Sequence, residues 1–108
     1  MQGNKIFFDT NSTIDNNTET VYIFLRDTSI YTKVTRQKMF DLDMVNGCFL
    51  QCITYNTREE VEKRAKAFAQ AINAREVEAE EFIKIEKLTE NRRVAHAFNV
   101  AERMIRGC

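Results

Sequence analysis

The chain has 108 residues, of which 44% are hydrophobic and 30% are charged, and its sixteen acidic residues balance sixteen lysines and arginines. This length and apolar content predict one folded domain that spans residues 1–108. The zero net charge disfavours a dedicated nucleic-acid binder, which usually carries a basic excess. The sequence has neither an apolar run long enough to span a bilayer nor an N-terminal secretory signal, so we expect a cytoplasmic protein that does not enter membranes.

Three segments in the first third of the chain have the composition of β-strands. Residues 5–9 form a short apolar run that we expect at a sheet edge, and residues 21–26 are β-branched and aromatic almost throughout. Residues 30–36 alternate apolar and polar side chains, which predicts a strand with one solvent-facing side. Residues 10–20 are almost all Asn, Thr, Asp and Ser, a composition that predicts an exposed and mobile loop.

The next segment, residues 37–45, fits two structures. Its alternating apolar and acidic residues favour a strand, which would pair with residues 48–55 through an Asn46-Gly47 turn. This dipeptide is the strongest short-range signal for a β-hairpin. The alternative is a short helix that Thr35 caps and Gly47 ends.

A helix is predicted from Thr57 to about Asn73. Thr57 and Glu60 have the spacing of a capping box, in which the threonine oxygen accepts from the N3 amide and the glutamate reaches back to the cap. The helix carries an apolar stripe at helical spacing, formed by Val61, Ala65, Phe68 and Ile72.

Residues 75–88 are also ambiguous, because they are rich in Glu, yet their apolar residues do not gather on one helical face. We predict a further strand here, around Phe82, Ile83 and Ile85, with a helix as the alternative. A final helix is predicted to begin at Thr89 and to end near Arg106.

These elements together predict an α+β domain. Its antiparallel sheet of three to four strands forms a meander, and two α-helices pack on one face of that sheet. The predicted core consists of Ile23, Leu25, Leu50, Val61, Phe68, Ile72, Phe98 and Ile105.

The sequence offers little for metal or cofactor chemistry. An odd number of cysteines, Cys48, Cys52 and Cys108, argues against a disulfide framework. We expect Cys48 and Cys52 to be small buried hydrophobes, since no further Cys or His lies near them to complete a zinc site. Asp41 and Asp43 lack a third ligand. No metal and no cofactor are therefore predicted.

Basic and polar residues form two groups that are candidates for binding a partner or nucleic acid. The first group is a ridge on the final helix and consists of Arg92, His96, Asn99, Arg103 and Arg106. The second group lies on the predicted hairpin and consists of Arg26, Lys33, Arg36 and Lys38. Guanidinium groups on a rigid element suit phosphate or carboxylate recognition, although such charges more often form an ordinary solvated surface.

A candidate acidic partner patch consists of Glu76, Glu78, Glu80 and Glu81. Carboxylates this close repel one another unless basic groups face them. Within the fold the candidate basic groups are Lys63, Arg64 and Arg75, and the alternative is the basic surface of a partner.

These features favour a non-enzymatic interaction protein, an inhibitor or adaptor that binds another protein. The shortness, neutrality and polar loop are typical of small accessory proteins of phages and mobile elements. The alternative is a nucleic-acid-binding module that uses the basic ridge and hairpin. A second alternative is a small enzyme acting through His96, which lacks an orienting carboxylate and a nucleophile on its face. The apolar face of the final helix predicts a homodimer, unless both helices fit side by side on one sheet.

Overall fold

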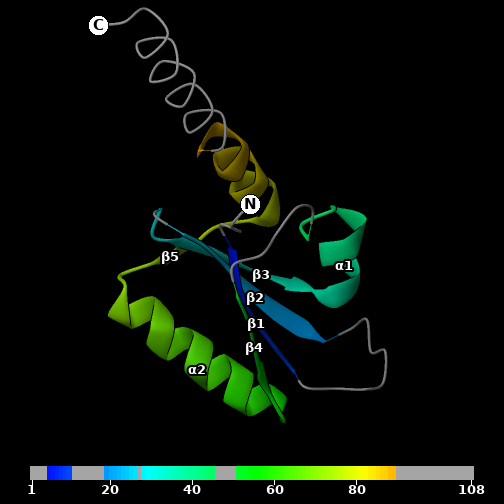
Figure 1. Ribbon diagram of the computed structural model, residues 1–108, viewed down its shortest axis with the longest axis vertical. Helices are drawn as coiled ribbons and strands as arrows, with labels where there is room; N and C mark the ends of the chain where they lie inside the picture. Colours follow the sequence, from blue (N-terminus) through cyan, green and yellow to red (C-terminus); the bar gives the residue numbers. More distant parts are fainter. Residues whose placement is uncertain (1–4, 11–18, 27, 46–50, 90–108) are drawn as a thin grey trace, which may run out of the picture.

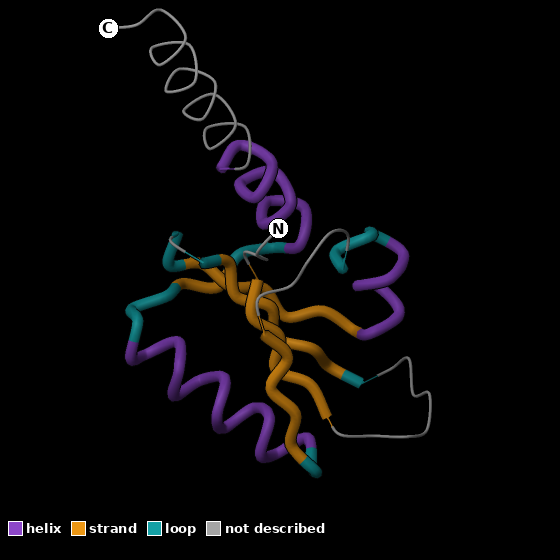
Figure 2. Tube along the Cα trace, viewed as in Figure 1, coloured by secondary structure: helices purple, strands orange, loops and turns teal. Residues whose placement is uncertain are grey.

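The computed structural model describes residues 5–10, 19–26, 28–45 and 51–89. In chain order the strands are β1 (Lys5–Thr10), β2 (Thr20–Leu25), β3 (Ile30–Thr35), β4 (Gln51–Tyr55) and β5 (Arg75–Glu76). Helix α1 (Arg36–Asp41) follows β3, and helix α2 (Arg58–Ala71) follows β4. Residues 79–89 are helical as well, and we refer to them as the 79–89 helix. Figures 1 and 2 show the strands gathered between these helices.

The five strands form one mixed sheet in the order β4-β1-β2-β3-β5. The β1-β2-β3 part is the predicted antiparallel meander, but β4 pairs parallel to β1 and β5 pairs parallel to β3. The prediction of a purely antiparallel sheet of three to four strands is therefore wrong at both edges. Residues 5–9, predicted as an edge strand, lie inside the sheet because β4 returns to pair beside them.

Helices cover both faces of the sheet, which corrects the prediction of two helices on one face. On one face, Phe8 and Phe24 pack with Val61 and Ala65 of α2. On the other face, Met39 of α1 and residues of the 79–89 helix pack against the alternate strand residues. Figure 1 shows α1 and α2 on opposite sides of the sheet. Residues 21–25 of β2 are all buried, since a strand in the middle of a three-layer structure has no wet face.

Residues 36–41 form a helix, so the strand predicted for residues 37–45 is wrong and its helical alternative is right. The Thr35 hydroxyl accepts from the Lys38 amide at 3.1 Å and caps the helix. Asp43 has a φ of 53°, and the Asp43 and Met44 amides donate back to the helix, which ends in a Schellman motif. Consequently residues 37–45 cannot form the predicted hairpin with residues 48–55. Asn46 and Gly47 lie outside the described residues.

Residues 75–88 are mostly helical, which corrects the predicted strand around Phe82. Only Arg75 and Glu76 pair with the sheet, and the 79–89 helix follows. Phe82 has no exposed surface, because the amphipathic side of this helix faces the sheet. Thr89 is itself helical and therefore does not begin a helix. The remainder of the predicted final helix lies outside the described residues, as does the dimer interface predicted on it.

The predicted helix is confirmed as α2, which Thr57 caps and which ends at Ala71, close to the predicted end at Asn73. The predicted burial of its last apolar residues is wrong. The Thr57 hydroxyl accepts from the Glu60 amide at 3.2 Å, and the Val61 side chain is buried between α2 and the sheet. Phe68 is only partly buried, and Ile72 is 39% exposed. Of the other predicted core residues, Ile23 and Leu25 are buried, whereas Leu50, Phe98 and Ile105 lie outside the described residues.

The predicted loop of residues 10–20 is shorter at both ends in the structure. Thr10 belongs to β1 and is buried, and Thr20 begins β2. Residues 11–18, which form the centre of that loop, lie outside the described residues.

Candidate functional site

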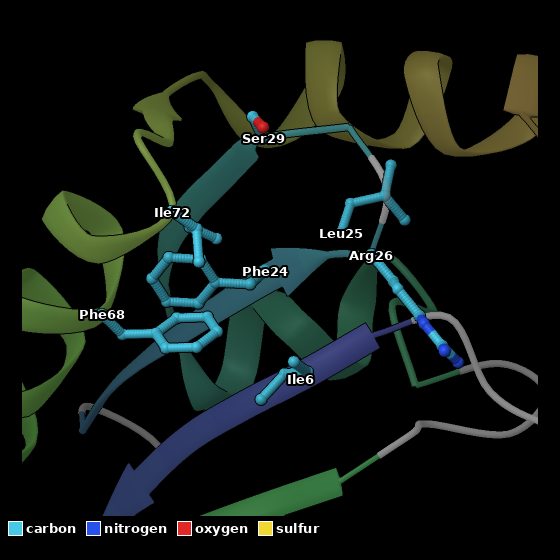
Figure 3. Close-up of a pocket in the computed structure, with 7 residues that line it drawn as sticks. All are labelled: Ile6, Phe24, Leu25, Arg26, Ser29, Phe68 and Ile72. Carbon is cyan, nitrogen blue, oxygen red and sulfur yellow. The ribbon is translucent and has the colours of Figure 1, made fainter.

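A solvent-open cleft lies between the C-terminal end of α2 and the sheet. Its volume is about 220 Å³. Its lining comes from β1, the end of β2, the β2–β3 turn and the last turns of α2. The lining residues are Ile6, Phe24, Leu25, Arg26, Ser29, Phe68 and Ile72. Figure 3 shows the Phe24 and Phe68 rings close together, with Ile72 and Ile6 around them.

The wall of the cleft is a packed aromatic group. The Phe24 ring lies edge-on to Phe68 with 4.9 Å between ring centroids and edge-on to Phe8 at 5.3 Å. Tyr31 of β3 stacks on the other side of Phe24 at 4.8 Å. Offset and edge-to-face contacts of this kind stabilise aromatic pairs beyond their buried area. The wall is therefore formed by the fold itself and needs no ligand to assemble it.

The mouth of the cleft is shaped by the end of α2. Ile72 is the C-cap, and Asn73 follows with a φ of 55°. The Asn73 amide donates to the Gln70 carbonyl at 3.2 Å, and the Ala74 amide donates to the Ala69 carbonyl at 2.8 Å. These two bonds are those of a Schellman motif, which turns the chain away from the helix axis. The turn leaves the Ile72 side chain at the rim instead of burying it under a further turn of helix.

Arg26 brings a positive charge to the same opening. It is exposed in the turn after β2, and in Figure 3 its side chain extends away from the two phenylalanine rings. Among the residues that the structure describes, no carboxylate forms an ion pair with it. An apolar cleft with one unpaired cation beside it is suited to an apolar group that lies next to a carboxylate.

The four basic residues predicted on the hairpin do not form one surface. Arg36 is buried at the start of α1, where its guanidinium pairs with the Asp9 carboxylate at 2.7 Å. Lys38 on α1 forms an exposed pair with Glu80 at 3.6 Å. Lys33 is exposed on β3, paired across the sheet with Tyr22, whereas Arg26 lies beyond the end of β2. Only Arg26 joins the cleft.

The acidic patch is explained in part by the start of the 79–89 helix. Glu78 and Glu80 lie at the N-terminal end of this helix, where the helix dipole favours negative charge. A backbone hydrogen bond and Lys38 hold the pKa of Glu80 below its ordinary value. Glu81 is exposed one residue further on, and Glu76 on β5 accepts from the Tyr31 hydroxyl at 3.5 Å. Within the described ranges the patch pairs with Lys38 and not with Lys63, Arg64 or Arg75.

The basic ridge, formed by Arg92, His96, Asn99, Arg103 and Arg106, lies wholly outside the described residues. Its role therefore stays a prediction.

Cys52 is exposed on β4, so its predicted burial is wrong. The thiol is nevertheless partly desolvated, and this desolvation, together with the Asp9 carboxylate, raises the pKa of Cys52. A raised pKa keeps the thiol protonated at neutral pH and lowers its reactivity. Cys48 and Cys108 lie outside the described residues.

No metal centre is apparent in the part of the chain that the structure describes, where no three His, Cys, Asp or Glu residues come together. Asp43 lies in the turn that ends α1, and the Asp41 carboxylate accepts from the side-chain amide (Nε2) of Gln37 at 2.7 Å. Across residues 5–10, 19–26, 28–45 and 51–89, no helix combines the length and apolar character needed to cross a membrane.

In comparisons with known proteins, no family model, no curated protein and no solved structure matches this chain. The geometry of the cleft is therefore the basis for assigning a function.

Sequence reasoning did not find the cleft. It placed Ile72 in the core, because the apolar stripe of α2 continues through that position without a break. In the sequence, Arg26 groups with the other basic residues of the predicted hairpin and not with the apolar residues that line the cleft. The one available signal was the polar Asn73 directly after the stripe, which is a suitable residue for ending a helix.

Proposed function

We propose that this chain is a non-enzymatic binding protein that holds a segment of another protein in the cleft at the end of α2. The observation that supports the proposal is the preformed aromatic wall of Phe24 and Phe68 beside Ile72, which is 39% exposed, and Arg26, which no carboxylate of the described residues pairs with. Binding of this kind serves an inhibitor or an adaptor, as the sequence predicts.

The size of the cleft favours a side chain over a small molecule. Sites for small molecules usually enclose about 300–1,000 Å³, which is more than the 220 Å³ found here. Protein interfaces instead place one or two large apolar anchors in small desolvated pockets. We therefore expect the partner segment to carry a large apolar residue with Asp or Glu close to it in sequence, so that the acid reaches Arg26.

The nucleic-acid alternative has less support in the described part of the chain. Of its hairpin residues, Arg36 is neutralised inside the fold by Asp9, and Lys38 is paired with Glu80. Such a module would bind labelled DNA or RNA with an affinity that falls steeply with salt.

A random peptide library displayed on phage tests the protein-binding proposal without knowledge of the partner. The reduced, full-length chain serves as bait, and enriched peptides are measured by titration calorimetry. We expect them to combine a large apolar residue with a nearby acid. Ile72→Glu places a carboxylate at the rim and should weaken binding by about thirtyfold, the effect of losing one anchor contact. Gln70→Glu, an exposed change of equal charge on the outer side of α2, should leave affinity unchanged.

Arg26 supplies the second arm of this test. Arg26→Glu should weaken binding of the acidic peptides by about tenfold or more, because it opposes two negative charges. Lys33→Glu is the matched control, since it makes the same charge change on β3, outside the cleft lining. The proposal is wrong if no peptide is enriched, or if the enriched peptides bind the Ile72→Glu variant as well as the original chain.

A further inference from the structure

The two edge strands of the sheet differ in how well they are protected from pairing with a further strand. One edge is β5, which has only two residues, and both, Arg75 and Glu76, are charged. The other edge is β4, whose five residues, Gln51–Tyr55, include no charge and no proline. Natural edge strands are usually kept from further pairing by shortness, charge or proline. The β5 edge has such protection, whereas the described residues of β4 have none of these three features.

The outer side of β4 is available for pairing within the described structure. Among the described strands, β4 pairs only with β1. Gln51, Cys52 and Thr54 are exposed, whereas Ile53 and Tyr55 pack partly under α2. An edge strand of this kind presents a row of backbone donors and acceptors that a further strand can satisfy.

The flank of α2 on the β4 side carries two opposite charges. The Arg64 guanidinium lies 6.0 Å from the centroid of the Tyr55 ring, so this flank overlooks β4. Glu60 lies four residues earlier and therefore on the same side of the helix. Glu62 lies on the other flank, where burial and then the nearby Glu62 carboxylate raise the pKa of Tyr22 on β2. Glu60 and Arg64 are both exposed.

We propose that β4 pairs antiparallel with β4 of a second copy of this chain about a two-fold axis. The sheet then continues across both chains, and the two α2 helices lie side by side and antiparallel. Because two-fold symmetry reverses the order of residues across the axis, Glu60 of each chain faces Arg64 of the other. A second copy fits this edge better than an acidic or a basic partner, since such a partner would satisfy one of these charges and repel the other.

This dimer is independent of the cleft, whose lining comes from β1, β2, the β2–β3 turn and α2 and includes no residue of β4. Failure of the dimer therefore leaves the proposed peptide binding in place, and failure of peptide binding leaves the dimer in place.

Charge reversal tests the dimer through its symmetry. Sedimentation equilibrium of the reduced chain at low salt should give twice the chain mass of 12.7 kDa. Glu60→Arg and Arg64→Glu each place like charges across the axis twice, and each should raise the dissociation constant by about tenfold or more. An equal mixture of the two variants should recover the original dissociation constant, because every pair across the axis is then opposite in charge. Within each variant helix the charges stay alike, so recovery on mixing can come only from contact between chains.

Lys63→Glu is the control variant, since it makes the same charge change as Arg64→Glu at the adjacent exposed position, on the outward side of α2. It should leave the dissociation constant unchanged. Hydrogen–deuterium exchange supplies a second readout, because amides within Gln51–Tyr55 should exchange more slowly as protein concentration rises. A monomeric mass at about 100 µM would overturn the proposal. So would a dimer that Arg64→Glu does not weaken, or a mixture of the two variants that stays monomeric.

Discussion

Two cations, Lys5 and Arg36, are buried in this fold, and each links elements that are distant in sequence. Lys5 is buried on β1, where its ammonium donates to the Met44 carbonyl and pairs with the Glu86 carboxylate at 2.8 Å. It thereby joins β1, the turn after α1 and the 79–89 helix. Arg36 likewise joins α1 to β1 through Asp9. A buried cation of this kind is tolerated only because its partners are in place, since an unpaired charge in the interior is very unfavourable.

We expect Lys5→Ala to lower the free energy of unfolding by about 3 kcal/mol, because it leaves the Glu86 carboxylate and the Met44 carbonyl without their cation. Lys38→Ala is the matched control. It breaks an ion pair with Glu80 that is largely solvent-exposed, and it should cost about 0.5 kcal/mol or less. Urea unfolding followed by circular dichroism measures both values. Equal losses would show that Lys5 is not buried and paired with Glu86 in solution.

The ends of the helices decide where the chain turns back to the sheet. Both α1 and α2 end in a Schellman motif, and in each the left-handed position is taken by a residue other than glycine, Asp43 or Asn73. Asn and Asp tolerate this conformation better than other side chains with a Cβ atom. The turn at Asn73 also sets the exposure of Ile72, so the end of this helix and the mouth of the cleft have one cause.

At Asn73, substitution should separate backbone conformation from side-chain contact. Asn73→Ala is expected to cost about 1 kcal/mol of unfolding free energy, because alanine disfavours positive φ. Asn73→Gly should cost nothing or stabilise the chain, since glycine is the usual residue at this position. Gln70→Ala, an exposed change inside the same helix, is the control and should be nearly neutral. If alanine and glycine at position 73 have the same effect, the motif does not depend on left-handed backbone.

The stability of the fold depends on a sheet that helices cover on both faces. The face opposite α2 is completed by the 79–89 helix, whose Phe82 has no exposed surface and lies in the cluster with Phe7 and Ile23. The two clusters share the backbone of β1 and β2, because alternate residues of each strand point to opposite faces. Loss of either cover therefore exposes half of the apolar side chains of these central strands.

We expect Phe82→Ala to lower the free energy of unfolding by about 3–5 kcal/mol, the usual cost of removing a fully buried aromatic side chain. Phe40→Ala, which removes a phenylalanine that is half-exposed on α1, should cost about 0.5 kcal/mol or less. Urea unfolding followed by both tyrosine fluorescence and far-UV circular dichroism measures these losses. A small loss for Phe82→Ala would mean that the 79–89 helix does not cover the sheet in solution.

Elements whose signals are local can be predicted from the sequence. The β-branched and aromatic residues of β2 and the alternation in β3 predicted these strands, and the Thr57 cap predicted where α2 begins. Such features depend on neighbours a few residues apart, so the sequence contains the full information for them. The short helix α1 was open to either assignment, because both its cap and its alternation are local and they disagree.

How these elements pair depends on contacts between residues that are distant in sequence, and these contacts exist only in the folded chain. Whether β4 joins a hairpin or runs parallel beside β1 depends on partners more than forty residues away, and the strong Asn46-Gly47 signal favoured the wrong partner. The helix around Phe82 also depends on distant residues. Its apolar residues show no single helical face in the sequence, but in the fold they pack on the sheet face opposite α2. The cleft exists for a similar reason. Ile6, Phe24 and Phe68 are distant in sequence, and only the packing of α2 on the sheet brings them to one opening, with Ile72 left at its rim.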